Sequence, residues 1–124
     1  MSTGAKNVFF QSRDELLRID LSSIVYFEAD GNYTRMISRN GLCAMVCMSL
    51  GKIEQFLSLR AKSSLDRYAR VGKRYIINLE NVYQINTLKQ ELILSDQRSF
   101  SYTLNMSKEA LRLLKDMIFP QTKQ

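Results

Sequence analysis

The stretch Arg70-Val-Gly-Lys-Arg-Tyr-Ile-Ile-Asn78 places three cations directly before a dense apolar triplet. The triplet, Tyr75-Ile-Ile77, has to be buried, so it fixes the basic segment to a rigid scaffold. Asn78 ends the run with a side chain suited to a turn that it closes through backbone hydrogen bonds. A basic loop held on a strand meets a polyanion with a defined geometry. The alternative interpretation is a solvated strand edge that its cations protect from aggregation.

The composition is typical of one soluble globular domain. The chain has 124 residues, of which 45% are hydrophobic and 24% charged, and this suits one domain with one core. Its net charge of +6 and pI of about 9.5 favour an acidic partner, such as nucleic acid, an anionic membrane surface or an acidic protein. The longest apolar run, residues 42–48, is shorter than the roughly 20 residues of a membrane span, and no signal peptide is visible. We therefore expect a cytoplasmic protein without a membrane partner.

The two cysteines and the lack of histidine limit the chemistry. Cys43 and Cys47 would be roughly 13 Å apart on one strand, too far for a disulfide, which predicts core thiols of a reduced compartment. Without histidine, a Cys/His zinc site is excluded and most acid–base mechanisms lose their usual base. Glu28 and Asp30 form a close acidic pair, but Asp30 precedes Gly31 and is better explained by turn chemistry. No phosphate-binding glycine pattern occurs. The sequence therefore predicts neither an enzyme nor a cofactor.

Short β-branched and aromatic segments separated by turn signals dominate the chain. The turn signals Ser12-Arg13-Asp14, Asp30-Gly31-Asn32 and Arg39-Asn40-Gly41 each join two such segments. Residues 42–48 are apolar on both sides, which predicts a strand buried on both faces. Strands are predicted over residues 8–11, 16–19, 24–28, 33–38, 42–48, 75–77, 82–85, 91–94 and 99–104.

Two segments have the apolar spacing of short helices. One follows Ser49, a candidate N-cap, and the other covers residues 107–117 with Ser107 or Asn105 as its cap. The pattern as a whole predicts a mainly β domain of antiparallel sheets with two short helices. We expect a flexible N-terminus over residues 1–6, the domain over residues 7–119 and a tail over residues 120–124.

Five pieces of the sequence follow one another in a familiar order. They are Ile24-Val-Tyr-Phe-Glu28, Gly31-Asn-Tyr33, Ser49-Leu50, Arg70-Val71 ahead of Tyr75-Ile-Ile-Asn78, and Val82 with Ile85. This order, with its gaps, resembles the LytTR family, the DNA-binding domain of bacterial response regulators. The likeness covers residues 7–118, which is nearly the whole chain.

The resemblance implies an elongated fold of about ten short strands in three antiparallel sheets. It also implies that loops, rather than a recognition helix, enter successive major grooves of double-stranded DNA. Two copies would bind direct repeats and bend the DNA, and a receiver domain or sensor kinase would act upstream in a two-component system. The implied function is sequence-specific regulation of bacterial transcription. A homodimer would gain support if the apolar strand over residues 42–48 lies at a sheet edge.

The resemblance places the DNA contacts in three loops, which correspond to residues 32–35, 72–74 and 104–108. Cations in these loops would neutralise phosphates, a sequence-independent contribution to binding. Short uncharged groups, among them Thr34, would suit base edges. Together with Arg70 of the basic segment, the candidate DNA-binding residues are Asn32, Tyr33, Thr34, Arg35, Arg70, Lys73, Arg74, Asn105, Ser107 and Lys108.

The chain departs from the family pattern in the second and third loops. The family's usual histidine, arginine and serine correspond to Gly72, Lys73 and Arg74, and its usual serine–arginine pair corresponds to Leu104-Asn105. Because arginine pairs with guanine and asparagine with adenine, Asn105 alters the expected base preference.

Simpler roles exist for several candidates. Asn32 is a common turn residue, Tyr33 could pack at a strand start, and Asn105 could cap the last helix. Tyr68 lies between cations, where it could stack on bases, although covering the helix–strand junction is favoured. For the whole chain, the alternative function is a protein-interaction or anionic-surface module that does not read DNA sequence.

Overall fold

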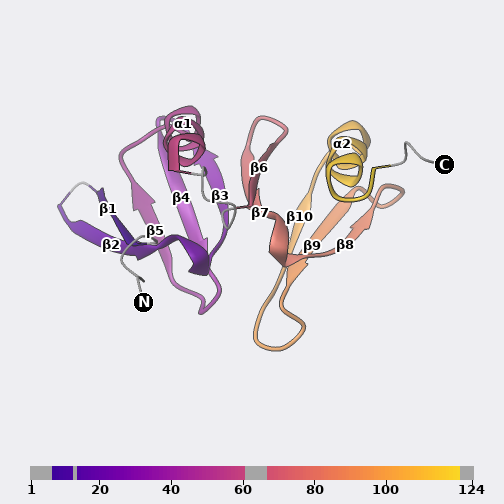
Figure 1. The fold of residues 1–124 in the computed structure, drawn as a ribbon, viewed down its shortest axis with the longest axis horizontal. Helices are drawn as coiled ribbons and strands as arrows, with labels where there is room; N and C mark the ends of the chain where they lie inside the picture. Colours follow the sequence, from indigo (N-terminus) through magenta and orange to yellow (C-terminus); the bar gives the residue numbers. More distant parts are fainter. Residues whose placement is uncertain (1–6, 13, 61–66, 121–124) are drawn as a thin grey trace.

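The computed structural model describes residues 7–12, 14–60 and 67–120, and it arranges them as ten strands and two α-helices (Figure 1). The expected flexible N-terminus (residues 1–6), Arg13 of the first predicted turn and the tail from residue 121 lie outside the described residues. The 3₁₀ helices Leu21–Ser23 and Leu79–Asn81 precede β3 and β8. The elements are β1 (Asn7–Gln11), β2 (Leu16–Asp20), β3 (Ile24–Asp30), β4 (Tyr33–Ser38), β5 (Cys43–Val46), α1 (Leu50–Arg60), β6 (Tyr68–Val71), β7 (Tyr75–Asn78), β8 (Val82–Asn86), β9 (Glu91–Ser95), β10 (Ser101–Asn105) and α2 (Lys108–Ile118).

The strands form three antiparallel sheets along the length of the molecule (Figure 1). The first sheet pairs β1 with β2, the central sheet has the order β5-β4-β3-β7-β6, and the third has the order β10-β9-β8. Helix α1 packs against one face of the central sheet, and α2 lies over the third sheet (Figure 1). The predicted class of a mainly β domain with two short helices is confirmed.

Strand β7 lies between two hydrophobic cores because its side chains alternate between the faces of the central sheet. Ile76 is 2% exposed and packs in the α1 core, which includes Phe27 and Ile53. Tyr75 and Ile77 are 8% and 0% exposed and pack in the α2 core, which includes residues of β9 and α2. The prediction that this triplet is buried is confirmed. The loop before β7 is therefore attached to both cores.

Polar side chains end the regular elements as the sequence predicts. The Asn78 side chain accepts a hydrogen bond from the Glu80 N–H at 3.0 Å and donates one to the Ile24 carbonyl at 3.2 Å. The Ser107 hydroxyl caps α2 by accepting a bond from the Ala110 N–H at 3.1 Å. Asn105 is not the cap, since it lies within β10 and faces Glu91.

The prediction of a strand over residues 42–48 that is buried on both faces is wrong. Strand β5 is shorter, and it is the edge strand of the central sheet, with β4 as its neighbour. An edge strand has one neighbouring strand and is only partly covered, so Met45 of β5 is 37% exposed, and Leu42, just before the strand, is 68% exposed. Cys43 and Cys47 are exposed rather than core thiols.

Sequence patterns missed strand β6 and placed the start of β10 too early. Tyr68–Val71 has a weak strand pattern of its own, but pairing with β7 supplies the ladder that makes it a strand. Residues 96–100 form a loop around Asp96, so β10 begins at Ser101.

Candidate nucleic-acid interface

The three candidate loops lie at the ends of strands that the fold brings together. The β3–β4 turn is joined to the loop before β7, because the Ala29 N–H donates to the Arg74 carbonyl at 2.8 Å. The same loop and the β10–α2 junction share a cleft of about 420 Å³. Residues 71–75 line one side of this cleft, and residues 105–107 with Ala110 line the other. The first loop thus adjoins the second, and the second adjoins the third.

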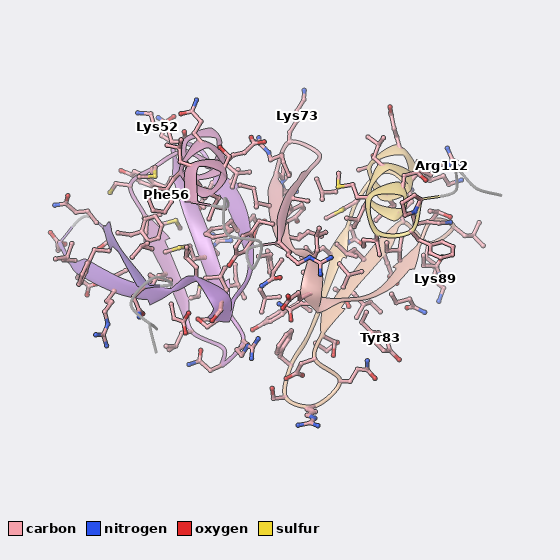
Figure 2. The ribbon with its side chains drawn as sticks, in the orientation of Figure 1. Lys52, Phe56, Lys73, Tyr83, Lys89 and Arg112 are labelled. Atoms are coloured by element: carbon pink, nitrogen blue, oxygen red, sulfur yellow. The ribbon has the colours of Figure 1, made fainter. Side chains whose placement is uncertain are left out.

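The second loop presents its cation at the tip of the β6–β7 hairpin. Gly72 has a φ of +67°, a left-handed conformation that glycine adopts without the strain of a side chain. Lys73 follows it and extends into solvent from the hairpin tip, between α1 and α2 (Figure 2). Its ammonium group is therefore available to an anionic partner.

Arg74 is exposed but oriented by two neighbours. Its Nη2 donates to Glu28 Oε2 at 2.9 Å, and its guanidinium carbon lies 5.4 Å from the centre of the Tyr75 ring. The side chain is 64% exposed, so Arg74 remains accessible from solvent. Arg74 combines accessibility with a defined orientation.

Arg70 is held by neighbouring groups and is 28% exposed. Its Nη1 pairs with Glu54 Oε1 at 2.7 Å, and its Nη2 donates to the Lys73 carbonyl at 3.0 Å. These contacts connect the backbone of the second loop to helix α1 through the Arg70 side chain. Arg70 therefore supports the presentation of Lys73.

In the first loop, the candidate residues have different surroundings. Asn32 is exposed in the turn, and Tyr33 is 47% exposed at the start of β4. Arg35 pairs with Glu28 at 3.2 Å and with Asp30 at 3.1 Å. Thr34 is fully buried, and its hydroxyl donates to the Met48 carbonyl at 2.7 Å. The expectation that Thr34 contacts a base is corrected, because this side chain faces the protein interior.

The third loop lies where β10 ends and α2 begins. Met106 is buried, and its N–H donates to the Gln90 carbonyl at 3.1 Å, which fixes the backbone between two exposed residues. Asn105 and Lys108 are exposed on either side of this anchor. Ser107 is also exposed, but its hydroxyl is engaged in capping α2.

The sequence drew attention to Glu28 and Asp30 as an acidic pair but missed their partners. Asp30 directly precedes the turn at residues 31–32, where Gly31 has a φ of +64°, and its carboxylate also pairs with Arg35. Glu28 and Arg35 are equally distant from the Gly31–Asn32 turn, and the register places them opposite each other. The rule that residues opposite each other in a hairpin interact would have predicted their ion pair.

Two buried phenols lie next to this site, since Tyr75 lines the cleft and Tyr26 packs against the Tyr75 ring. Burial, and after it the negative charge of Glu28, raises the pKa of Tyr26 to about 12. Burial likewise raises the pKa of Tyr75. Both hydroxyls are therefore neutral at physiological pH. In the described part of the chain, no cluster of three or more His, Cys, Asp or Glu side chains could hold a metal ion.

The structure thus combines three antiparallel sheets and two helices with three loops that adjoin one another. A family model for the LytTr DNA-binding domain matches residues 14–119, and the chain belongs to this family. The family assignment supports DNA binding and regulation of transcription, and the family is not a catalytic one.

A solved structure shares the fold. It is the LytTr DNA-binding domain of a protein described as a methyl-accepting/DNA response regulator from Bacillus cereus. The match has a TM-score of 0.65 and 16% identity, and it covers 92% of this chain and 97% of the other. A search of curated proteins gave no significant match. Among the described residues, no helix is long and apolar enough to cross a membrane.

Proposed function

We propose that this chain binds double-stranded DNA in a sequence-specific manner through its three loops and regulates transcription in the bacterial cytoplasm. The observation that carries the proposal is the shared edge of these loops. Lys73 and Arg74 lie on one side of a cleft and Asn105 on the other, and the first loop is joined to the second through Ala29. An adjoining set of loops can enter a groove as one surface.

The residues divide into two kinds of contact. Lys73 and Lys108 are exposed ammonium groups suited to phosphates, which fix the position of a protein on DNA. Arg74 can form two hydrogen bonds to guanine, and Asn32 or Asn105 can do the same with adenine. This division supports a binding mode in which cations provide affinity and three side chains provide sequence preference.

Two further features belong to the proposal. Two copies of the chain bind direct repeats, and a receiver domain or sensor kinase of a two-component system controls them. Both features are implied by the resemblance to the LytTR family, and the family assignment supports them. The position of β5 at the edge of the central sheet supports the proposal of a dimer, since an edge strand can pair with a second copy.

The test is selection of binding sites from a random double-stranded DNA library at physiological salt. We expect enrichment of two short repeats about one helical turn apart. Recovery of duplexes without any enriched sequence would contradict sequence-specific binding. That result would favour the alternative of a module for anionic surfaces, and binding to anionic vesicles would then be measured.

A further inference from the structure

Glu28 is a largely buried carboxylate that holds arginines from two different loops. Its side chain is 16% exposed. One oxygen accepts a hydrogen bond from Arg35 at 3.2 Å, and the other accepts one from Arg74 at 2.9 Å. A single residue of β3 therefore connects the first and second loops through their charges.

The two arginines differ in how completely they are engaged. Arg35 is 37% exposed, and both of its terminal nitrogens are occupied, one by Glu28 and the other by Asp30. Arg74 is 64% exposed and gives one terminal nitrogen to Glu28. The Tyr75 ring lies 5.4 Å from its guanidinium carbon. Arg74 is therefore oriented, with further N–H groups left for a ligand.

The carboxylates also balance the charge of the interface. Glu28 and Asp30 offset the charges of Arg35 and Arg74, and Glu54 offsets that of Arg70. Within the described residues, Lys73 and Lys108 form no ion pair. A surface built for phosphate attraction alone would leave its arginines unpaired. Here carboxylates partly neutralise the arginines, so the lysines provide most of the non-specific attraction to phosphates.

We propose that Glu28 is a positioning residue that sets the ratio of specific to non-specific DNA binding. It holds Arg74 in the orientation needed at a base edge, and it competes with phosphates for Arg74 and Arg35. The inference rests on the proposed function, since it assigns a role within the same three-loop site.

The physical basis is the difference between a base edge and a phosphate. Two hydrogen bonds to guanine need a guanidinium of fixed orientation, and fixing it before binding lowers the entropy lost in the complex. A phosphate accepts a cation from many directions, so a freed arginine binds it readily. Removing the Glu28 charge should therefore weaken the specific complex and strengthen the non-specific one.

The test compares the 124-residue chain with Glu28→Gln on two duplexes, the selected site and a scrambled sequence of equal length. We expect Glu28→Gln to bind the scrambled duplex several-fold more tightly and the selected duplex more weakly, so that their ratio falls about tenfold. The salt slope on the scrambled duplex should steepen by about one to two units, since each freed arginine neutralises a phosphate.

Two controls separate positioning from charge and from folding. Glu54→Gln makes the same change in charge but frees Arg70, so it should shift both duplexes alike and leave their ratio unchanged. In an Arg74→Ala background, Glu28→Gln should no longer lower the ratio, because the positioned group is gone. Glu28→Asp keeps the charge and shortens the reach, so it should show the same loss of ratio to a smaller extent even if Glu28→Gln does not fold.

The outcomes distinguish this inference from the proposed function. A parent chain that prefers the selected duplex, together with Glu28 variants that keep this preference, would overturn the role of Glu28 alone. Equal binding of both duplexes by the parent would overturn the proposed function, and the inference with it.

Discussion

Two carboxylates at opposite edges of the molecule are used in different ways. Glu28 accepts its hydrogen bonds from the side chains of Arg35 and Arg74. Asp96, in the loop between β9 and β10, accepts backbone N–H groups of Arg98, Ser99 and Phe100, together with the Ser99 hydroxyl. The β9–β10 loop and the β6–β7 hairpin tip point in opposite directions (Figure 1).

The difference shows which hydrogen bonds of the protein can be replaced by hydrogen bonds to a ligand. An arginine side chain can leave Glu28 and bind a phosphate or a base without unfolding its loop. A backbone N–H can leave Asp96 only if the loop itself changes shape. Ion pairs between side chains therefore mark the adaptable edge of this protein, and bonds to the backbone mark the fixed one.

The largest expected effect is that of Arg74→Ala at the adaptable edge. Because Arg74 is the accessible and oriented arginine, its loss should reduce discrimination against mismatched sites by about 1–3 kcal/mol. Competition binding with single-base variants of the selected site measures this. Unchanged discrimination at every position would remove Arg74 from the interface.

A smaller effect is expected for Thr34→Val, which tests whether burial excludes a residue from the interface. The hydroxyl of Thr34 donates to the Met48 carbonyl inside the protein. Its loss should lower the free energy of unfolding by about 1 kcal/mol and leave the base preference unchanged. Urea unfolding and the same competition assay measure the two quantities. Altered base preference with unchanged stability would restore Thr34 as a contact residue.

Lys73→Ala should act on affinity without acting on preference. The exposed ammonium group at the hairpin tip has no orienting ion pair with a described residue, so it serves phosphates of any sequence. Binding to selected and scrambled duplexes should weaken equally, and the salt slope should decrease by about one unit. Titrations at several salt concentrations measure the slope, and an unchanged slope would mean that Lys73 contacts no phosphate.

The smallest effect is expected for Asp96→Asn at the fixed edge. The Ser99 hydroxyl, followed by the backbone N–H groups, holds the pKa of Asp96 well below its ordinary value of 3.8. Because the folded-state pKa is depressed, the stabilisation is present above the ordinary pKa and is lost as the pH falls below it. Parent and variant should therefore differ in Tm at pH 7 and converge in acid. DNA binding at pH 7 should be unchanged, and a loss of binding would break the contrast between the two edges.

Sequence reasoning identified the parts of the fold that depend on local patterns. The buried triplet after Arg74, the cap at Ser107 and the turn chemistry of Asn78 each rest on residues close together in the chain. It failed for Tyr68–Val71, whose strand depends on pairing with β7, and for Cys43, whose exposure depends on which strand ends the sheet.

The candidate site was predicted as a set of positions but not as a network. Loop membership follows from the motif order, so Lys73, Arg74 and Asn105 could be selected from the sequence. The pairing of Arg74 with Glu28, which are 46 positions apart, depends on β3 and β7 being neighbours. The burial of Thr34 similarly depends on the chain after β5 crossing beside β4.

The position of β7 between the two cores has a consequence for dynamics. Opening of either core by local unfolding would release one face of the strand that carries the second loop. DNA held by that loop should therefore slow amide hydrogen exchange in both cores at once, including strands that never approach the DNA. Binding of DNA at the three loops would therefore be detectable as slower amide hydrogen exchange in strands far from the DNA.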